Sequence, residues 1–178
     1  MTEKSFFRLF TKPSILNSKT PHFTPIYFQF CPSCHQKRVV EFGEWLCEEI
    51  LKAVPHRHFT FSLPKILRRY LLYDRKLLSE LSRCAWDSLE VFLLSFPPKQ
   101  ETAPGAVIAI QTFGDFMNFN PHCHVLCTDG GFYGSGSFKV AQALETEPLE
   151  KIFQHKVLGM LLRKGKITEE DEYATHQS

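Results

Sequence analysis

The sequence has no continuous apolar run of about 18 residues, the length that a membrane-spanning helix requires. Residues 1–20 also lack the apolar core and the small-residue cleavage site of a secretory signal peptide. We therefore predict a cytoplasmic protein without membrane contact, whose six cysteines are thiols or metal ligands rather than disulfides. The glycine-rich residues 130–136 do not continue into the Gly-Lys-Ser/Thr of a phosphate loop, which argues against that class of nucleotide site.

The composition is that of a folded protein with an uneven charge. Hydrophobic residues make up 43% of the chain, and the 17 phenylalanines are too many for a disordered tail. The net charge of +2 is unevenly distributed. Residues 1–100 contain 15 Lys and Arg and 9 Asp and Glu, whereas residues 101–178 contain 6 Lys and Arg and 10 Asp and Glu. A basic half favours a polyanionic partner, and a solvated charged face is the alternative.

Hydrophobic patterns predict an α+β fold in which helices pack on an antiparallel sheet. The apolar run 106–113 indicates a central strand that is buried on both faces. Residues 1–30 show no clear period and are left irregular. Strands are expected over residues 56–63, 106–113 and 118–129, a hairpin around residues 130–136, and helices over residues 37–54 and 148–164, with a helix pair over residues 64–96.

Two histidines on one strand are the main candidate for chemistry. Alternate residues of a strand share a face, so His122 and His124 point one way and Cys123 points the other, towards the core. Neutral imidazole is a common metal ligand, and the pair therefore predicts a metal site. A pair of surface histidines is the alternative. In a second His-x-His, Arg57 falls on the apolar face, so we expect His58 to be a surface or supporting group rather than a ligand.

A basic face is predicted on the helix that follows Pro64. At about 100° per residue, five cations fall on one arc of this helix, and they suit a DNA backbone. Tyr70 and Tyr73 fall on the opposite, apolar arc, so we expect both in the core. A solvated face is again the alternative. The five cations are Lys65, Arg68, Arg69, Arg75 and Lys76.

The histidine pair, preceded by Asn118-Phe119-Asn120-Pro121 and followed by Thr128-Asp129-Gly130, resembles the HUH motif of rolling-circle transposases. It looks most like the two-tyrosine branch, which has an N-terminal zinc-binding domain. Cys31-Pro32-Ser33-Cys34 looks like the second half of that domain, and the family's upstream cysteines are absent. The resemblance therefore implies a chain truncated at both ends, with an irregular segment (1–30), a zinc-domain remnant with a helix (31–54), a partial HUH domain (55–170) and a disordered tail (171–178).

The resemblance also implies a site and a partner. Mg²⁺ or Mn²⁺ would bind His122, His124 and a third ligand, and it would polarise a phosphodiester of single-stranded DNA. The third ligand stays open among Asp115, Gln111 and His58. Zn²⁺ at Cys31 and Cys34 is a further expectation, weakened by the missing upstream cysteines.

The resemblance further implies a tyrosine nucleophile that this chain does not supply. Tyr133 lies in a turn and Tyr173 in the divergent tail, so neither matches the family's nucleophile. We expect a transposase-family protein that does not cleave DNA alone. Two alternatives are a DNA-binding module that acts through the basic helix and the zinc knuckle, and an unrelated metal-dependent hydrolase.

Overall fold

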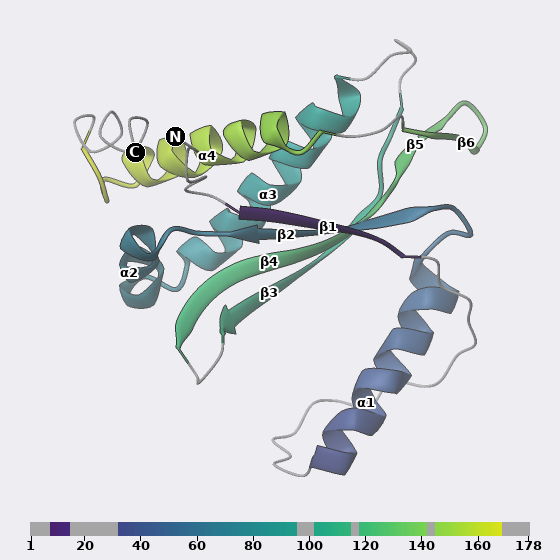
Figure 1. Cartoon of the computed structure of the whole chain (residues 1–178), viewed down its shortest axis with the longest axis horizontal. Coiled ribbons are helices and arrows are strands. Elements are labelled where there is room, and N and C mark those ends of the chain that lie inside the picture. Colours follow the sequence, from purple (N-terminus) through teal and green to yellow (C-terminus); the bar gives the residue numbers. More distant parts are fainter. Residues whose placement is uncertain (1–7, 15–31, 96–101, 115–117, 142–144, 169–178) are drawn as a thin grey trace, which may run out of the picture. The chain divides into compact units, whose positions relative to one another are not determined.

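The computed structural model describes residues 8–14, 32–95, 102–114, 118–141 and 145–168 (Figure 1). The chain divides into two compact units, of which the larger comprises Met1–Pro13 and His56–Ser178 and the smaller Ser14–Pro55. No helix among the described residues is long and apolar enough to cross a membrane.

The larger unit is built on a sheet of four described strands in the order β1-β2-β4-β3. β4 lies between β2 and β3 and is antiparallel to both, which confirms the predicted α+β fold with an antiparallel sheet. β1 is a strand in the region that showed no period. It adjoins β2 at the edge of the sheet, so its conformation follows from pairing and not from a pattern of its own. The strands are β1 (Arg8–Ser14), β2 (His56–Ser62), β3 (Ala106–Phe113) and β4 (Phe119–Thr128).

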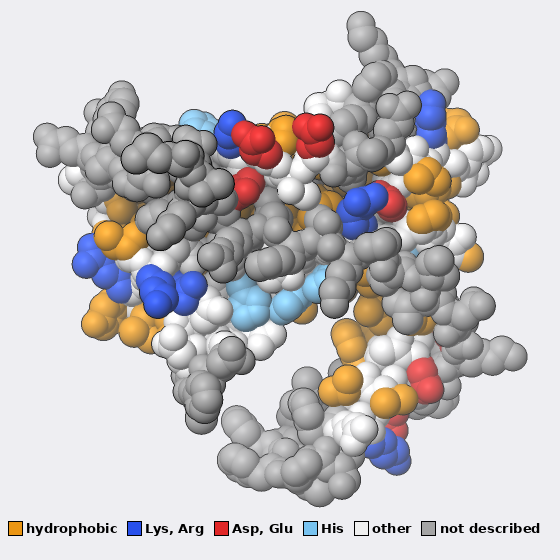
Figure 2. All heavy atoms as spheres, viewed as in Figure 1, with side chains coloured by type: hydrophobic (Ala, Val, Ile, Leu, Met, Phe, Trp, Pro, Cys, Tyr) orange, Lys and Arg blue, Asp and Glu red, His pale blue; other side chains and the backbone are white. Residues whose placement is uncertain are grey.

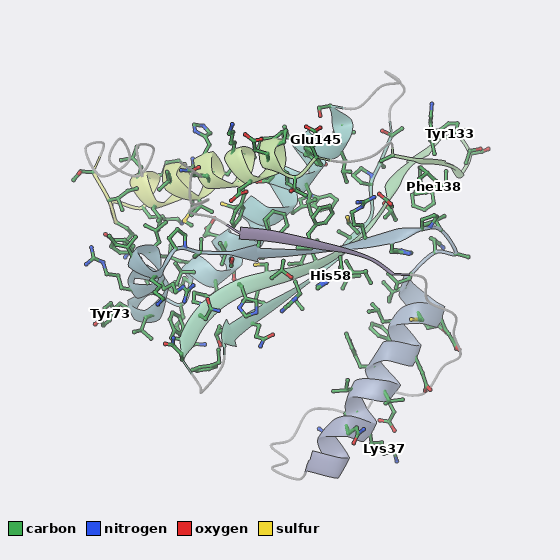
Figure 3. The ribbon with its side chains drawn as sticks, viewed as in Figure 1. Lys37, His58, Tyr73, Tyr133, Phe138 and Glu145 are labelled. Atoms are coloured by element: carbon green, nitrogen blue, oxygen red, sulfur yellow. The ribbon has the colours of Figure 1, made fainter. Side chains whose placement is uncertain are left out.

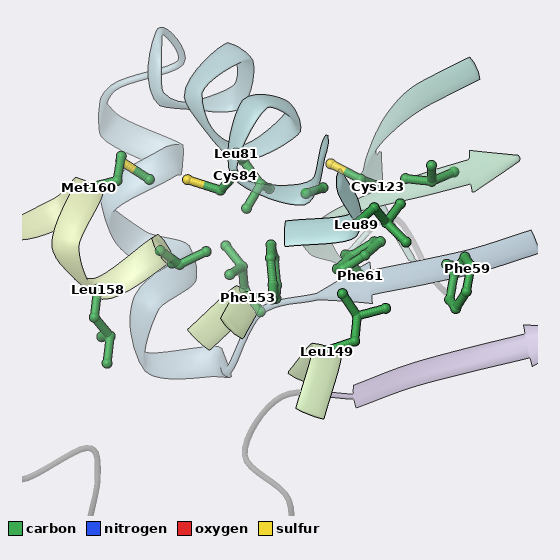
Figure 4. Packing of buried hydrophobic residues seen from close by; sticks show 14 of the residues in the cluster. Phe59, Phe61, Leu81, Cys84, Leu89, Cys123, Leu149, Phe153, Leu158 and Met160 are labelled. Carbon is green, nitrogen blue, oxygen red and sulfur yellow. The ribbon is translucent and has the colours of Figure 1, made fainter. Parts of the chain in front are cut away.

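One face of this sheet carries the core. Phe61 of β2 is fully buried and meets Phe153 edge-on, with ring centroids 4.8 Å apart (Figure 4). Helices α3 and α4 pack against each other, and α3 also packs against β3 and β4. The prediction that Cys123 faces the core is confirmed, because its side chain is fully buried. The helices of the unit are α2 (Lys65–Tyr73), α3 (Leu77–Leu94) and α4 (Glu147–Arg163).

The expectation that residues 106–113 form a central strand is wrong. β3 is one of the two edge strands of the described sheet, and Ile110 and Phe113 are 39% and 46% exposed. Only Ala106 and Ile108 pack against the core. An apolar run indicates that a strand packs against a core. Whether the strand is central depends on the tertiary structure, which decides if it pairs with a neighbouring strand on each side.

The helix pair expected over residues 64–96 is present, but its first helix ends before Arg75 and Lys76, which the predicted basic face included. Asp74 leaves the helical conformation, with φ −130° and ψ 88°, and separates α2 from α3. Its carboxylate accepts a hydrogen bond from the Lys76 backbone N–H at 3.3 Å and pairs with Lys166 at 3.1 Å. Tyr73 was expected in the core but is 87% exposed, because the buried side of α2 is the one that carries Leu67 and Leu71. Tyr70, by contrast, does pack against the core as expected.

A hairpin follows β4 directly, as the sequence predicted. β5 (Gly130–Tyr133) pairs antiparallel with β6 (Ser137–Val140). The turn between them has Gly134 at φ 56° and Gly136 at φ 111°. These values favour glycine, which explains why the glycine-rich stretch is a turn and not a ligand loop.

In the smaller unit, α1 (Pro32–Trp45) continues into a π-helical turn, η1 (Leu46–Ile50). The helix therefore begins earlier and ends earlier than the predicted range 37–54. Cys47 of η1 is half-buried. Cys31 and the side chain of Cys34 lie outside the described residues, as does the tail 171–178, so the zinc site and the disordered tail stay predictions.

Candidate metal site on the open face of the sheet

The two histidines of β4 lie on the sheet face opposite the core. Their register places Thr60 of β2 and Ala109 of β3 on either side of His124. Because strand side chains alternate, the same face receives groups from all three strands. Figure 2 shows histidine side chains gathered where β4 and its neighbours run in Figure 1. We call this set the histidine face, and it consists of His58, Thr60, Gln111, Asn120, His122 and His124.

His124 is the centre of a chain of polar contacts. Its ring stacks on that of His58, with centroids 5.2 Å apart and planes 8° apart. Its Nδ1 lies 3.1 Å from His58 Nε2 and 3.4 Å from Thr60 Oγ1. Its Nε2 lies 3.2 Å from Gln111 Oε1. Both ring nitrogens of His124 therefore have partners, and each partner comes from a neighbouring strand.

These contacts assign the proton on His124. Gln111 Nε2 donates to the Phe113 carbonyl at 3.0 Å, so Gln111 presents its oxygen to His124. An amide oxygen only accepts, hence His124 Nε2 carries the proton and donates it. Nδ1 of the neutral ring is then the lone-pair nitrogen. Burial, followed by the neighbouring His122 and His58, lowers the pKa of His124 below its usual range, which favours this neutral ring.

His122 has the same kind of support. Its side chain is almost enclosed, at 9% exposure, and its ring meets that of His124 with centroids 4.8 Å apart. Its Nδ1 lies 2.6 Å from the Asn120 carbonyl oxygen. A carbonyl only accepts, so Nδ1 donates and Nε2 holds the lone pair. A metal-binding histidine almost always donates its other ring nitrogen in this way.

Other donors test how well the site suits a hard divalent ion. The side-chain oxygen of Asn120 is buried without a hydrogen-bond partner among the described residues. Such an oxygen is unusual in a folded protein, and amide oxygens are ligands that Mg²⁺ and Mn²⁺ accept. The described residues do not, however, bring three His, Cys, Asp or Glu side chains into a ready metal-binding group. The donors are of the types that a divalent ion accepts, but among the described residues they do not converge on one point.

Of the proposed third ligands, the structure brings His58 and Gln111 to the pair, and Asp115 lies outside the described residues. Sequence reasoning missed Thr60 and Asn120. The sequence could have placed Thr60 on the same face as His58, because the two residues are two positions apart on one strand. Nothing in the sequence indicated that β2 would lie beside β4, so the contact of Thr60 with His124 was not predictable.

The predicted cations are not one continuous stripe. Lys65, Arg68 and Arg69 lie on α2, whereas Arg75 and Lys76 lie in the break before α3. Arg68 Nε donates to the Leu63 carbonyl at 3.0 Å, and partial burial lowers the pKa of its guanidinium. The Arg69 guanidinium lies 5.0 Å over the Tyr70 ring. Lys65 and Arg69 are exposed, close in sequence to Ser62, which pairs with His122.

The core side of β4 gives a prediction that depends on pH. Burial raises the pKa of the Cys123 and Cys127 thiols to about 12 and that of Cys84 to about 11, above an ordinary value of 9.0. The thiols of the unfolded chain ionise at lower pH than these buried thiols do. These groups therefore favour folding at low pH, and the free energy of unfolding falls as pH rises from 9 towards 12.

At pH 8, iodoacetamide should modify the half-buried Cys47 but should not modify Cys84, Cys123 and Cys127 until urea is added, as peptide mass spectrometry would measure. Equal labelling of all four would contradict the burial.

Comparison with known proteins agrees with the sequence resemblance. Residues 105–178, which include the whole histidine strand, match a family model described as "Putative transposase" with the short name Y2_Tnp. The match continues beyond Glu170, where the sequence resemblance was expected to stop.

The chain is also 32% identical over 111 residues to the transposase for insertion sequence element IS801 of Pseudomonas savastanoi pv. phaseolicola. That stretch is 61% of this chain and 25% of the relative, so the match spans about a quarter of the relative's length. No solved structure matches the chain. Residues 105–178 are therefore similar to the Y2_Tnp family of transposases.

Proposed function

We propose that this chain supplies the metal-binding part of a transposase that acts on single-stranded DNA. Nε2 of His122 and Nδ1 of His124 would hold Mg²⁺ or Mn²⁺. The observation that carries the proposal is the pair of assigned tautomers, because hydrogen bonds to the Asn120 carbonyl and the Gln111 amide leave one lone pair on each ring. The curated relative is named as a transposase, which is the reason to take DNA as the substrate.

The chemistry divides between the ion and the chain. When bound, a divalent ion polarises a phosphodiester oxygen and offsets its developing negative charge. The hydrogen bonds of His122 and His124 fix the orientation of the two rings and of their lone pairs. The nearly enclosed ring of His122 limits the access of water to the site. Exposed Lys65 and Arg69, on the helix that follows Ser62, would contact the DNA backbone.

The described tyrosines are poorly placed to attack at this site. Figure 3 shows Tyr73 and Tyr133 near opposite ends of the larger unit, with His58 between them. The Tyr70 hydroxyl accepts a hydrogen bond from Arg69 at 3.0 Å and its ring packs on the core. We therefore propose that the chain binds metal and DNA without cleaving alone.

The test is Mn²⁺-dependent binding of fluorescent single-stranded DNA, measured by anisotropy for the wild type and the His122→Ala/His124→Ala variant. We expect the wild type to bind more tightly with Mn²⁺ than with EDTA, and the variant to lose this difference. A gel under denaturing conditions should show no tyrosine-linked adduct. Equal DNA affinity of both proteins with and without Mn²⁺ would instead favour a DNA-binding module that acts through α2, and an adduct would refute the lack of cleavage.

A further inference from the structure

We propose that α2 binds single-stranded DNA by stacking a nucleobase on the ring of Tyr73, while cations of the same helix contact the phosphates. The inference rests on the proposed function and names a residue that would select unpaired DNA. It gives a role to a side chain that the sequence analysis placed in the core. Three observations lead to it: the exposure of Tyr73, its position beside cations and the excess of positive charge on this segment.

The side of α2 that faces away from the core carries large side chains that the core does not use. Tyr73 is 87% exposed, and Ile66 and Leu72 are 57% and 47% exposed. Figure 3 shows the Tyr73 side chain beyond α2, away from the strands of the sheet. A ring this exposed can receive a flat apolar partner without any rearrangement of the core. We call this set the outer side of α2, and it consists of Lys65, Ile66, Arg69, Leu72 and Tyr73.

Cations share the outer side with Tyr73. Residues four apart are neighbours on a helix surface, so Lys65, Arg69 and Tyr73 form one row. Figure 2 shows Lys and Arg side chains next to hydrophobic ones where α2 lies in Figure 1. The Arg69 guanidinium lies 5.0 Å over the Tyr70 ring, and its Nη2 donates to the Tyr70 hydroxyl at 3.0 Å. These contacts hold the Arg69 charge one helical turn before Tyr73, so a strand whose phosphate meets Arg69 would bring a base next to the Tyr73 ring.

The charge of the segment suits a polyanion. Residues 64–76 contain five cations and one acid, Asp74. Asp74 pairs with Lys166 at 3.1 Å, so its charge is already compensated from outside the segment. A polynucleotide supplies both groups that the outer side would contact, a line of negative charges and flat bases. In a duplex each base is covered by its neighbours in the stack, so stacking on Tyr73 favours a single strand.

The outer side lies within reach of a strand bound at the histidine face. α2 packs against β4, and it begins three residues after Ser62, which pairs with His122. From Lys65 to Tyr73 the helix rises about 12 Å. This is the length of about four nucleotides at the spacing of one strand in a duplex, and of fewer in an extended strand. Tyr73 would therefore hold the DNA a few nucleotides away from the two histidines and not at the reacting phosphate.

The competing explanations are that α2 holds DNA by charge alone, or that its outer side binds a second copy of the chain. Two fluorescent probes of about 12 nucleotides separate stacking from charge: an oligothymidylate, and an abasic oligomer that keeps the phosphates without bases. Their affinity for the full chain is measured by anisotropy in EDTA, so that no metal ion contributes. The variants are Tyr73→Ala and Tyr73→Phe, and Tyr133→Ala is the control near the opposite end of the larger unit (Figure 3).

We expect Tyr73→Ala to weaken binding of the oligothymidylate by about fivefold or more. Tyr73→Phe keeps a ring, and Tyr133 lies away from α2, so these variants should stay within about twofold of the wild type. On the abasic oligomer the wild type and all three variants should bind alike. Stacking releases no counterions, so Tyr73→Ala should leave the slope of log affinity against log salt concentration unchanged, whereas Lys65→Gln should reduce its magnitude by about 0.7. Circular dichroism would show whether the variants remain folded.

The outcomes distinguish this inference from the proposed function. If the wild type binds no single-stranded DNA with or without Mn²⁺, both are wrong. If Tyr73→Ala loses affinity but His122→Ala/His124→Ala responds to Mn²⁺ as the wild type does, stacking stands and the proposed metal site is wrong.

Three results would overturn the role of Tyr73 alone. The first is wild-type affinity of Tyr73→Ala for the oligothymidylate. The second is an equal loss on both oligomers, which would indicate a contact with the backbone. The third is a wild-type dimer that Tyr73→Ala dissociates, measured by analytical ultracentrifugation, which would assign the outer side of α2 to a second copy of the chain.

Discussion

Replacing Phe61 by alanine is expected to lower the free energy of unfolding of the larger unit by about 3–5 kcal/mol. The side chain is fully buried and packs edge-on against Phe153, on the face of β2 opposite His58 and Thr60. Its removal would leave a cavity between the sheet and α4, and the surrounding residues would close it only in part. Urea denaturation followed by circular dichroism measures the loss.

Phe113→Ala is the matched control in the same unit. Phe113 is 46% exposed on the edge strand and contacts Phe119 with ring centroids 6.3 Å apart. We expect a loss of about 1 kcal/mol there, because a half-exposed ring has less area to return to water. Equal losses at the two positions would show that the core does not lie where α4 meets β2.

Breaking the ion pair between Arg57 and Asp129 is expected to cost about 3 kcal/mol when either partner is replaced by alanine. The guanidinium donates two hydrogen bonds to the carboxylate, Nε at 3.0 Å and Nη2 at 2.8 Å. The two side chains are only 20% and 14% exposed. A single replacement therefore leaves a largely buried charge without its partner, and urea denaturation would show the loss.

The double variant Arg57→Ala/Asp129→Ala provides the control. It removes both charges, so we expect it to be more stable than the sum of the single losses predicts, by about 1–3 kcal/mol. Strictly additive losses would mean that the two side chains contribute independently. The pair also explains how Arg57 can occupy the apolar face of β2: Asp129, at the end of β4, neutralises it at the margin of the core.

The histidine strand was predictable because its evidence is local. Alternation alone placed His122 and His124 opposite Cys123, and the structure agrees. The break at Asp74 was less predictable, because residues on both sides of it continue a helical pattern. The partners of Asp74, a backbone N–H and Lys166 from beyond α4, include one that is distant in sequence.

Except for β1, the sequence by itself determined whether each element is a helix or a strand, and it determined the two faces of β4 and the residues that carry the resemblance to transposases. These properties depend on side-chain periods and on short motifs, which neighbouring residues define. Only the tertiary structure decided that β3 is an edge strand, and that His58 and Gln111 meet His124. Such contacts join residues up to 66 positions apart, and they depend on which strands pair and in which register, a choice made by the burial of the whole core.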